Sequence, residues 1–109
     1  MPVIEIFELD ELIKYSQENS NTLCIIDFSA TWCGPCKRIA PYYESLSSEY
    51  SDVRFYKTDV DEASELCEHF SITSMPTFIF LKNNETVGSV LGANKKELKN
   101  TLDKLTTSF

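Results

Sequence analysis

The sequence predicts an α/β fold in which four helices flank a central mixed five-stranded sheet. Segments of β character alternate with segments of helical periodicity, and only a short turn separates the last two strands. Residues 23–28 are apolar apart from Asp27, as is typical of a strand buried on both faces. The 109 residues, 42% of them hydrophobic, suit a single domain over residues 1–109 with one core.

The first half of the chain predicts a strand, a helix, a central strand and a long helix. Residues 3–7 alternate loosely and are rich in β-forming residues, and residues 10–17 have helical spacing. The polar residues 18–21 end this helix, and the strand at 23–28 follows. We expect the next helix from about Cys33 to Tyr50, because apolar residues recur there at helical intervals: Ile39, Tyr42, Tyr43 and Leu46.

The second half predicts a strand, a short helix, a hairpin and a last helix. Residues 53–58 form a strand that a right-handed crossover places parallel to the strand at 23–28. Asp61 can cap a helix that ends near Phe70. Residues 77–81 and 86–91 predict an antiparallel hairpin with a tight turn at 82–85, and Asn94 can cap a helix through about Leu105.

Charge and hydropathy argue against two classes of partner. The formal net charge of -7 and a pI near 4.6 repel nucleic acid and anionic lipid surfaces. We find no apolar run near the roughly 20 residues that span a bilayer. The acidic start, Met1 to Glu11, does not resemble a secretory signal, so a reducing cytoplasm is the expected compartment.

Two cysteines stand close together in Trp32-Cys33-Gly34-Pro35-Cys36, between a buried strand and a helix. Backbone N–H groups and the dipole at a helix N-terminus stabilise a thiolate, so Cys33 is the expected nucleophile and Cys36, one turn deeper, the resolving thiol. Gly34 and Pro35 suit the first turn, where proline needs no N–H partner. The spacing predicts a redox-active disulfide.

The alternative for a Cys-x-x-Cys pair is half of a zinc site, which needs two further ligands. Cys24 is expected within a core strand, Cys67 stands alone, and His69 lies on a polar helix where a solvated side chain is expected. We therefore favour redox chemistry over a metal site.

Residues 26–37, the segment Met75-Pro76-Thr77-Phe78, and Gly88 and Gly92 together resemble the thioredoxin family over nearly the whole chain. The Phe-Ser-Ala-Thr-Trp form of the motif is similar to that of the cytosolic eukaryotic members. The resemblance implies the thioredoxin fold and a protein-disulfide reductase that works through Cys33 and Cys36.

The resemblance also implies supporting roles for residues away from the cysteine pair. Asp27 would take the proton of Cys36, although a strand-end residue is the alternative reading, and Lys57 matches a position where some members place a lysine beside that acid. Asp61 matches a position that hydrogen-bonds the active-site tryptophan, and helix capping explains it equally well.

A surface for client proteins is implied by the same resemblance. Pro76 matches a cis proline that would expose the Met75 backbone beside Cys33, where an extended client segment could pair with it. Core packing is the alternative for two members of the implied apolar surface, Val60 and Ile72. The surface comprises Trp32, Val60, Ile72, Met75, Gly92 and Ala93.

The resemblance finally implies how the protein is supplied with electrons. It would bind no cofactor and receive electrons from NADPH through a flavoprotein thioredoxin reductase, and it is expected to be a monomer. An oxidase or isomerase of the same fold usually has another residue pair between the cysteines and a secretory signal. A binding protein that uses its redox state to hold a partner is a further alternative.

Overall fold

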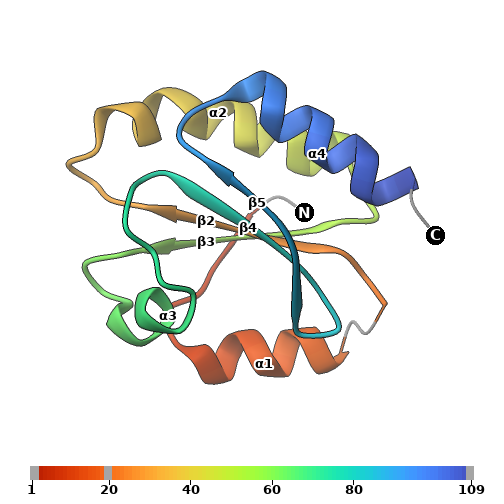
Figure 1. The fold of residues 1–109 in the computed structure, drawn as a ribbon, viewed down its shortest axis with the longest axis horizontal. Helices are drawn as coiled ribbons and strands as arrows, with labels where there is room; N and C mark the ends of the chain where they lie inside the picture. The colour runs from red at the N-terminus through yellow and green to blue at the C-terminus, as the bar shows by residue number, and fades with distance from the viewer. Residues whose placement is uncertain (1–2, 19–20, 108–109) are drawn as a thin grey trace.

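The computed structural model describes residues 3–18 and 21–107. Its five strands form one sheet in the order β1-β3-β2-β4-β5, with α2 and α4 on one face and α1 and α3 on the other (Figure 1). This arrangement confirms the predicted fold class. The elements are β1 (Ile4–Glu5), α1 (Leu9–Glu18), β2 (Cys24–Ser29), α2 (Gly34–Glu49), β3 (Arg54–Asp59), α3 (Ser64–His69), β4 (Thr77–Lys82), β5 (Glu85–Leu91) and α4 (Lys95–Thr107).

The central strand β2 pairs parallel with β3 and antiparallel with β4. Its residues from Cys24 to Phe28 are all buried, which confirms the prediction of a strand covered on both faces. Because β1 also runs parallel to β3 and β5 antiparallel to β4, the sheet is mixed as predicted.

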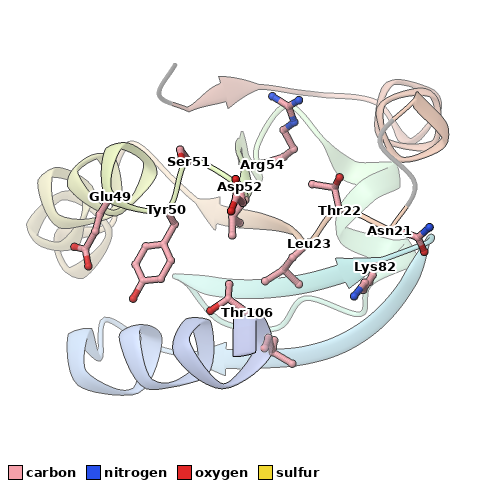
Figure 2. A pocket seen from close by; sticks show the side chains of 12 residues that line it. Asn21, Thr22, Leu23, Glu49, Tyr50, Ser51, Asp52, Arg54, Lys82 and Thr106 are labelled. Carbon is pink, nitrogen blue, oxygen red and sulfur yellow. The ribbon is translucent and has the colours of Figure 1, made fainter. Parts of the chain in front are cut away.

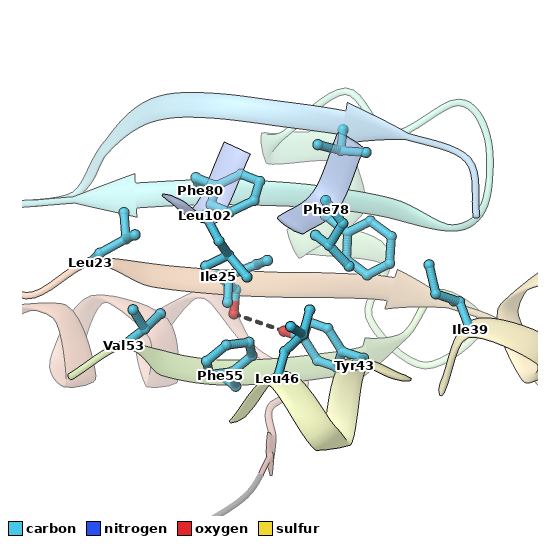
Figure 3. Packing of buried hydrophobic residues seen from close by; sticks show 12 residues of the cluster. Leu23, Ile25, Ile39, Tyr43, Leu46, Val53, Phe55, Phe78, Phe80 and Leu102 are labelled. Atoms are coloured by element: carbon cyan, nitrogen blue, oxygen red, sulfur yellow. Dashed lines mark hydrogen bonds between the residues drawn. The ribbon is translucent and has the colours of Figure 1, made fainter. Parts of the chain in front are cut away.

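The larger core lies between the sheet and the helices α2 and α4 (Figure 3). Ile25, Phe55 and Phe78 project from three neighbouring strands into this layer. Tyr43 of α2 packs among them, and its hydroxyl group donates to the backbone oxygens of Tyr56 (2.6 Å) and Ile25 (3.2 Å). A second cluster, which includes Leu12 of α1 and Leu66 of α3, covers the opposite face.

Local signals correctly predicted the cap of α4 and the hairpin turn. The side-chain oxygen of Asn94 accepts a hydrogen bond from the Glu97 N–H (3.0 Å), which confirms the predicted cap of α4. The hairpin turn is tight, and Asn83 and Asn84 have positive φ angles of 54° and 67°, typical of a two-residue turn.

Two predicted boundaries were wrong. The strand expected over residues 3–7 is limited to Ile4–Glu5, because after Ile6 donates to the Lys57 carbonyl the chain turns toward α1. The helix expected to begin at Asp61 begins at Ser64, with Ala63 at its N-cap position.

Candidate active site

The cysteine pair lies at the start of α2, just after the loop that follows β2. Cys33 occupies the N-cap position of α2, and its sulfur accepts a hydrogen bond from the Cys36 N–H (3.2 Å). Pro35 lies in the first turn, where its missing N–H leaves no partner unsatisfied. The helix start therefore directs an N–H group at the Cys33 sulfur, which stabilises negative charge there.

Cys33 and Cys36 are joined by a disulfide bond, and their Cα atoms are 5.3 Å apart. Both are buried, and they form a small cluster with Ala30. Two residues distant in sequence, Val60 and Met75, pack against this cluster. The fold thus brings two members of the predicted client surface to the cysteine pair.

Trp32 projects from the same loop into solvent, with 64% of its surface exposed. Its indole N–H donates to the Asp61 carboxylate at 2.9 Å. The prediction that Asp61 caps α3 was therefore wrong, and the alternative taken from the family resemblance is confirmed. Asp61 is itself held by the Asp59 carboxylate, which accepts from the Asp61 N–H (2.9 Å).

Asp27 lies in β2 and is 3% exposed. Burial raises the pKa of Asp27 to about 6, and a hydrogen bond from the Ser29 hydroxyl group and the charge of Lys57 act against this rise. Lys57 is in register with Asp27 on the neighbouring strand. The sequence analysis missed Ser29, although a hydroxyl two residues after an acid on one strand face was a usable signal.

A cavity of about 190 Å³ is shared by Asp27 and Cys36. Asp27, Lys57 and Cys36 all line it, together with Glu5 and Ala40. It is large enough for several water molecules at about 30 Å³ each. A proton could therefore move between Cys36, Asp27 and solvent within this space.

The remaining residues of the predicted client surface differ in how far they are exposed to solvent. Met75–Pro76 is a cis peptide bond, as predicted. The Gly92 N–H donates to the Pro76 carbonyl (2.8 Å), and Gly92 has a φ of +85° that favours glycine. Ala93 is exposed, whereas Ile72 packs against the core cluster beneath α1 and α3.

The other two cysteines lie away from the disulfide bond. Burial raises the pKa of the buried Cys24 thiol to about 11, and burial also raises the pKa of Cys67, with Asp59 and Asp61 adding to the effect.

His69 is exposed and contacts the ring of Phe70. Within residues 3–18 and 21–107, no group of three or more His, Cys, Asp or Glu side chains could hold a metal ion.

A larger cavity of about 680 Å³ lies at the opposite end of the sheet (Figure 2). Leu23 and Arg54 line it where β2 and β3 begin, and Tyr50 lines it where α2 ends. The cysteine pair instead follows the end of β2, so this cavity is separate from the site.

Among the described residues, no helix combines the length and apolar character that crossing a membrane requires.

Comparison with known proteins places the chain among known families. A family model described as Thioredoxin matches residues 6–104. Thioredoxin 1 of Plasmodium falciparum is 50% identical over 97 residues, which cover 89% of this chain and 88% of that protein. Human thioredoxin is 47% identical over 83 residues, covering 76% and 79% of the two chains. The crystal structure of a poplar thioredoxin h aligns over 100% of both chains with a TM-score of 0.91 and 36% identity.

Proposed function

This chain belongs to the thioredoxin family, and on that premise we propose how its residues reduce a disulfide in a client protein. The chain is a thiol-disulfide oxidoreductase, and Cys33 and Cys36 fit its dithiol active site. The observation that carries the proposal is the disulfide bond between these residues at the first turn of α2.

In the first step the Cys33 thiolate attacks one sulfur of the client disulfide. A bond forms between Cys33 and that sulfur, and the other client sulfur leaves as a thiolate. The position of Cys33 at the helix N-cap supports this role, because the N–H group that faces its sulfur stabilises the attacking anion.

In the second step Cys36 resolves the mixed disulfide. Asp27 takes the Cys36 proton, the Cys36 thiolate attacks the Cys33 sulfur, and the second client sulfur leaves as a thiolate. Two electrons have then passed to the client, and Cys33 and Cys36 are oxidised to a disulfide. The cavity shared by Asp27 and Cys36, and the pKa of about 6 for Asp27, support its role as the acceptor.

The client segment lies against the apolar surface around the disulfide. Met75 and Val60 pack beside Cys33, and the exposed Trp32 stands next to it. We assign docking roles to these residues and to Ile72, Gly92 and Ala93, with Gly34, Pro35 and Pro76 supporting the shape of the site. Lys57 acts on Asp27 through its charge, which lowers the pKa of Asp27 against the effect of burial.

Further proposals concern the setting of the reaction. Electrons come from NADPH through a flavoprotein thioredoxin reductase, and the chain needs no bound cofactor of its own. Residues 1–109 work as one domain and as a monomer in the cytoplasm, on disulfide-containing client proteins rather than on nucleic acid or membranes. The net charge of -7 supports the last point.

Two experiments test the proposed function. Cys36→Ser should accumulate covalent complexes with clients, because the mixed disulfide forms but is not resolved. Cys67→Ser is the matched control, since it removes a thiol outside the site and should trap nothing. Reduction of insulin with thioredoxin reductase and NADPH should show turnover that Cys33→Ser abolishes, and binding without turnover would instead indicate a redox-dependent binding protein.

A further inference from the structure

Three charged side chains stand in one row on the face of the sheet that α2 covers. Lys57 of β3 is in register with Glu5 of β1 on one side and with Asp27 of β2 on the other. In-register residues of adjacent strands project to the same face, with the strands about 5 Å apart. All three line the 190 Å³ cavity that reaches Cys36, so Lys57 stands between two carboxylates.

The two carboxylates differ in their surroundings. Asp27 is buried, whereas Glu5 and Lys57 are exposed to solvent. The Lys57 charge lowers the pKa of Asp27, and a flexible lysine stem can bring the ammonium group toward either acid. An ammonium group held near Glu5 would lower the pKa of Asp27 less than one held near Asp27.

Other polar groups face Asp27 from the elements packed against it. Ser29 of β2 donates a hydrogen bond to it, and the charge of Asp27 adds to the burial that raises the pKa of the Tyr43 hydroxyl group. The remaining titratable groups around the cavity come from α2 and β3: Cys36, Lys37 and Asp59. Glu5 and Asp27 are the two residues that the sheet puts in register with Lys57.

We propose that Glu5 is a positioning residue, which shares the Lys57 ammonium group with Asp27 and so keeps Asp27 a better proton acceptor for Cys36. This rests on the proposed function, in which the Cys36 proton moves to Asp27 before Cys36 attacks the mixed disulfide. Glu5 itself exchanges no proton and no electron in the reaction.

The test is to measure the pKa of Asp27 in the oxidised Glu5→Gln protein. The titration is monitored through the NMR signal of the Asp27 carboxyl carbon. We expect the Asp27 pKa to fall by about 0.3 units or more, because Lys57 is then shared with no second acid. The pH midpoint of the resolving step in single-turnover kinetics should fall with it. Glu8→Gln is the matched control, since Glu8 is exposed on the same segment and does not line the cavity.

A second background tests whether the effect passes through Lys57. In Lys57→Met, Glu5→Gln should shift the Asp27 titration by less than half as much, because the shared ammonium group is gone. Equal shifts in both backgrounds would overturn the proposal. An unmoved titration in a Glu5→Gln protein of native thermal stability would overturn it as well, and Glu5→Asp, which keeps the charge, should titrate like the unchanged protein.

The failure of this proposal is distinguishable from failure of the proposed function. If Asp27→Asn removes the pH dependence of resolution while Glu5→Gln leaves it unmoved, Asp27 keeps its role and Glu5 loses it. If Asp27→Asn leaves the resolving step unchanged in rate and pH dependence, Asp27 is not the acceptor, and both proposals about this cavity fall.

Discussion

Asp27 and Thr58 both carry buried side-chain oxygen atoms, but the sheet gives those atoms different surroundings. Asp27 accepts a hydrogen bond from Ser29 and borders a cavity with Lys57 at its rim. Thr58 is 2% exposed, and its hydroxyl oxygen has no hydrogen-bond partner in the described part of the chain. A buried polar group without a partner destabilises the folded state. For the buried acid of Asp27 we propose a role in proton transfer.

Asp27→Asn is expected to stabilise the oxidised protein at pH 7 by about 1–3 kcal/mol. Burial raises the pKa of Asp27 from 3.8 to about 6, so between these values the native state binds more protons than the unfolded state. Stability therefore falls as pH rises from about 4 through 6, and a neutral amide avoids that loss. Urea unfolding should show the gain at pH 7 and little of it at pH 4. An equal gain at both pH values would contradict this reasoning.

Thr58→Val should raise the free energy of unfolding by about 1 kcal/mol, because it replaces an unpartnered buried hydroxyl with a methyl group of similar size. Thr77→Val is the matched control. Thr77 is equally buried, but its hydroxyl donates to the Ser74 carbonyl at 2.7 Å, so this change should lower the free energy of unfolding by about 1 kcal/mol. Chemical denaturation of both variants measures the difference, and a loss in Thr58→Val would refute the expectation.

At the scale of elements, helices α2, α3 and α4 differ in the residue at the N-cap position and in whether its side chain accepts a hydrogen bond. The sulfur of Cys33 accepts the N–H of Cys36 at the start of α2, and the amide of Asn94 accepts an N–H at the start of α4. Ala63 precedes α3 and makes no side-chain cap. At α2 the cap atom is thus also one of the two sulfurs of the disulfide bond.

Asn94→Ala should lower the free energy of unfolding by about 1 kcal/mol, because it leaves the Glu97 N–H without its side-chain acceptor. Asn94→Ser should lose much less, since serine also caps helices. Thermal or urea unfolding of the two variants compares them directly. Similar losses in both would show that the cap hydrogen bond is not the cause.

At the scale of the whole molecule, the sheet lies between two hydrophobic cores, and a cavity lies at each end of its parallel strands. The ends of the parallel strands β2 and β3 carry the disulfide and the Asp27 cavity, and the beginnings of these strands carry the larger cavity. Strands β3, β2 and β4 lie inside the sheet and pair on both sides, whereas β1 and β5 form its edges.

Native-state hydrogen exchange should therefore rank the strands by position. Amides of β2 and β4, such as those of Ile26 and Ile79, should exchange only through global unfolding, because both strands are buried and paired on each side. Amides of β5 should exchange faster by local opening, since most of its residues are exposed. Equal protection in β5 and β2 would contradict this ranking.

Much of this organisation was predictable from local patterns in the sequence. The alternation of strands and helices, the cap at Asn94, the hairpin turn and the position of Cys33 before a helix all depend on residues near one another in the chain. The start of α3 was mispredicted because the carboxylate of Asp61, an acceptable cap, bonds to Trp32 instead, 29 residues away. A local pattern does not show which donor, the backbone N–H groups of α3 or the distant indole N–H, the Asp61 carboxylate accepts from.

The sequence by itself determined the order of the elements and the type of chemistry at Cys33 and Cys36, because periodicity, caps and a short motif act over a few residues. The family resemblance implied Met75 beside Cys33 and Lys57 beside Asp27, whereas only the tertiary structure decided that Glu5 lies on the other side of Lys57. Strand register sets these contacts, and register follows from the packing of whole faces of the sheet rather than from any single segment.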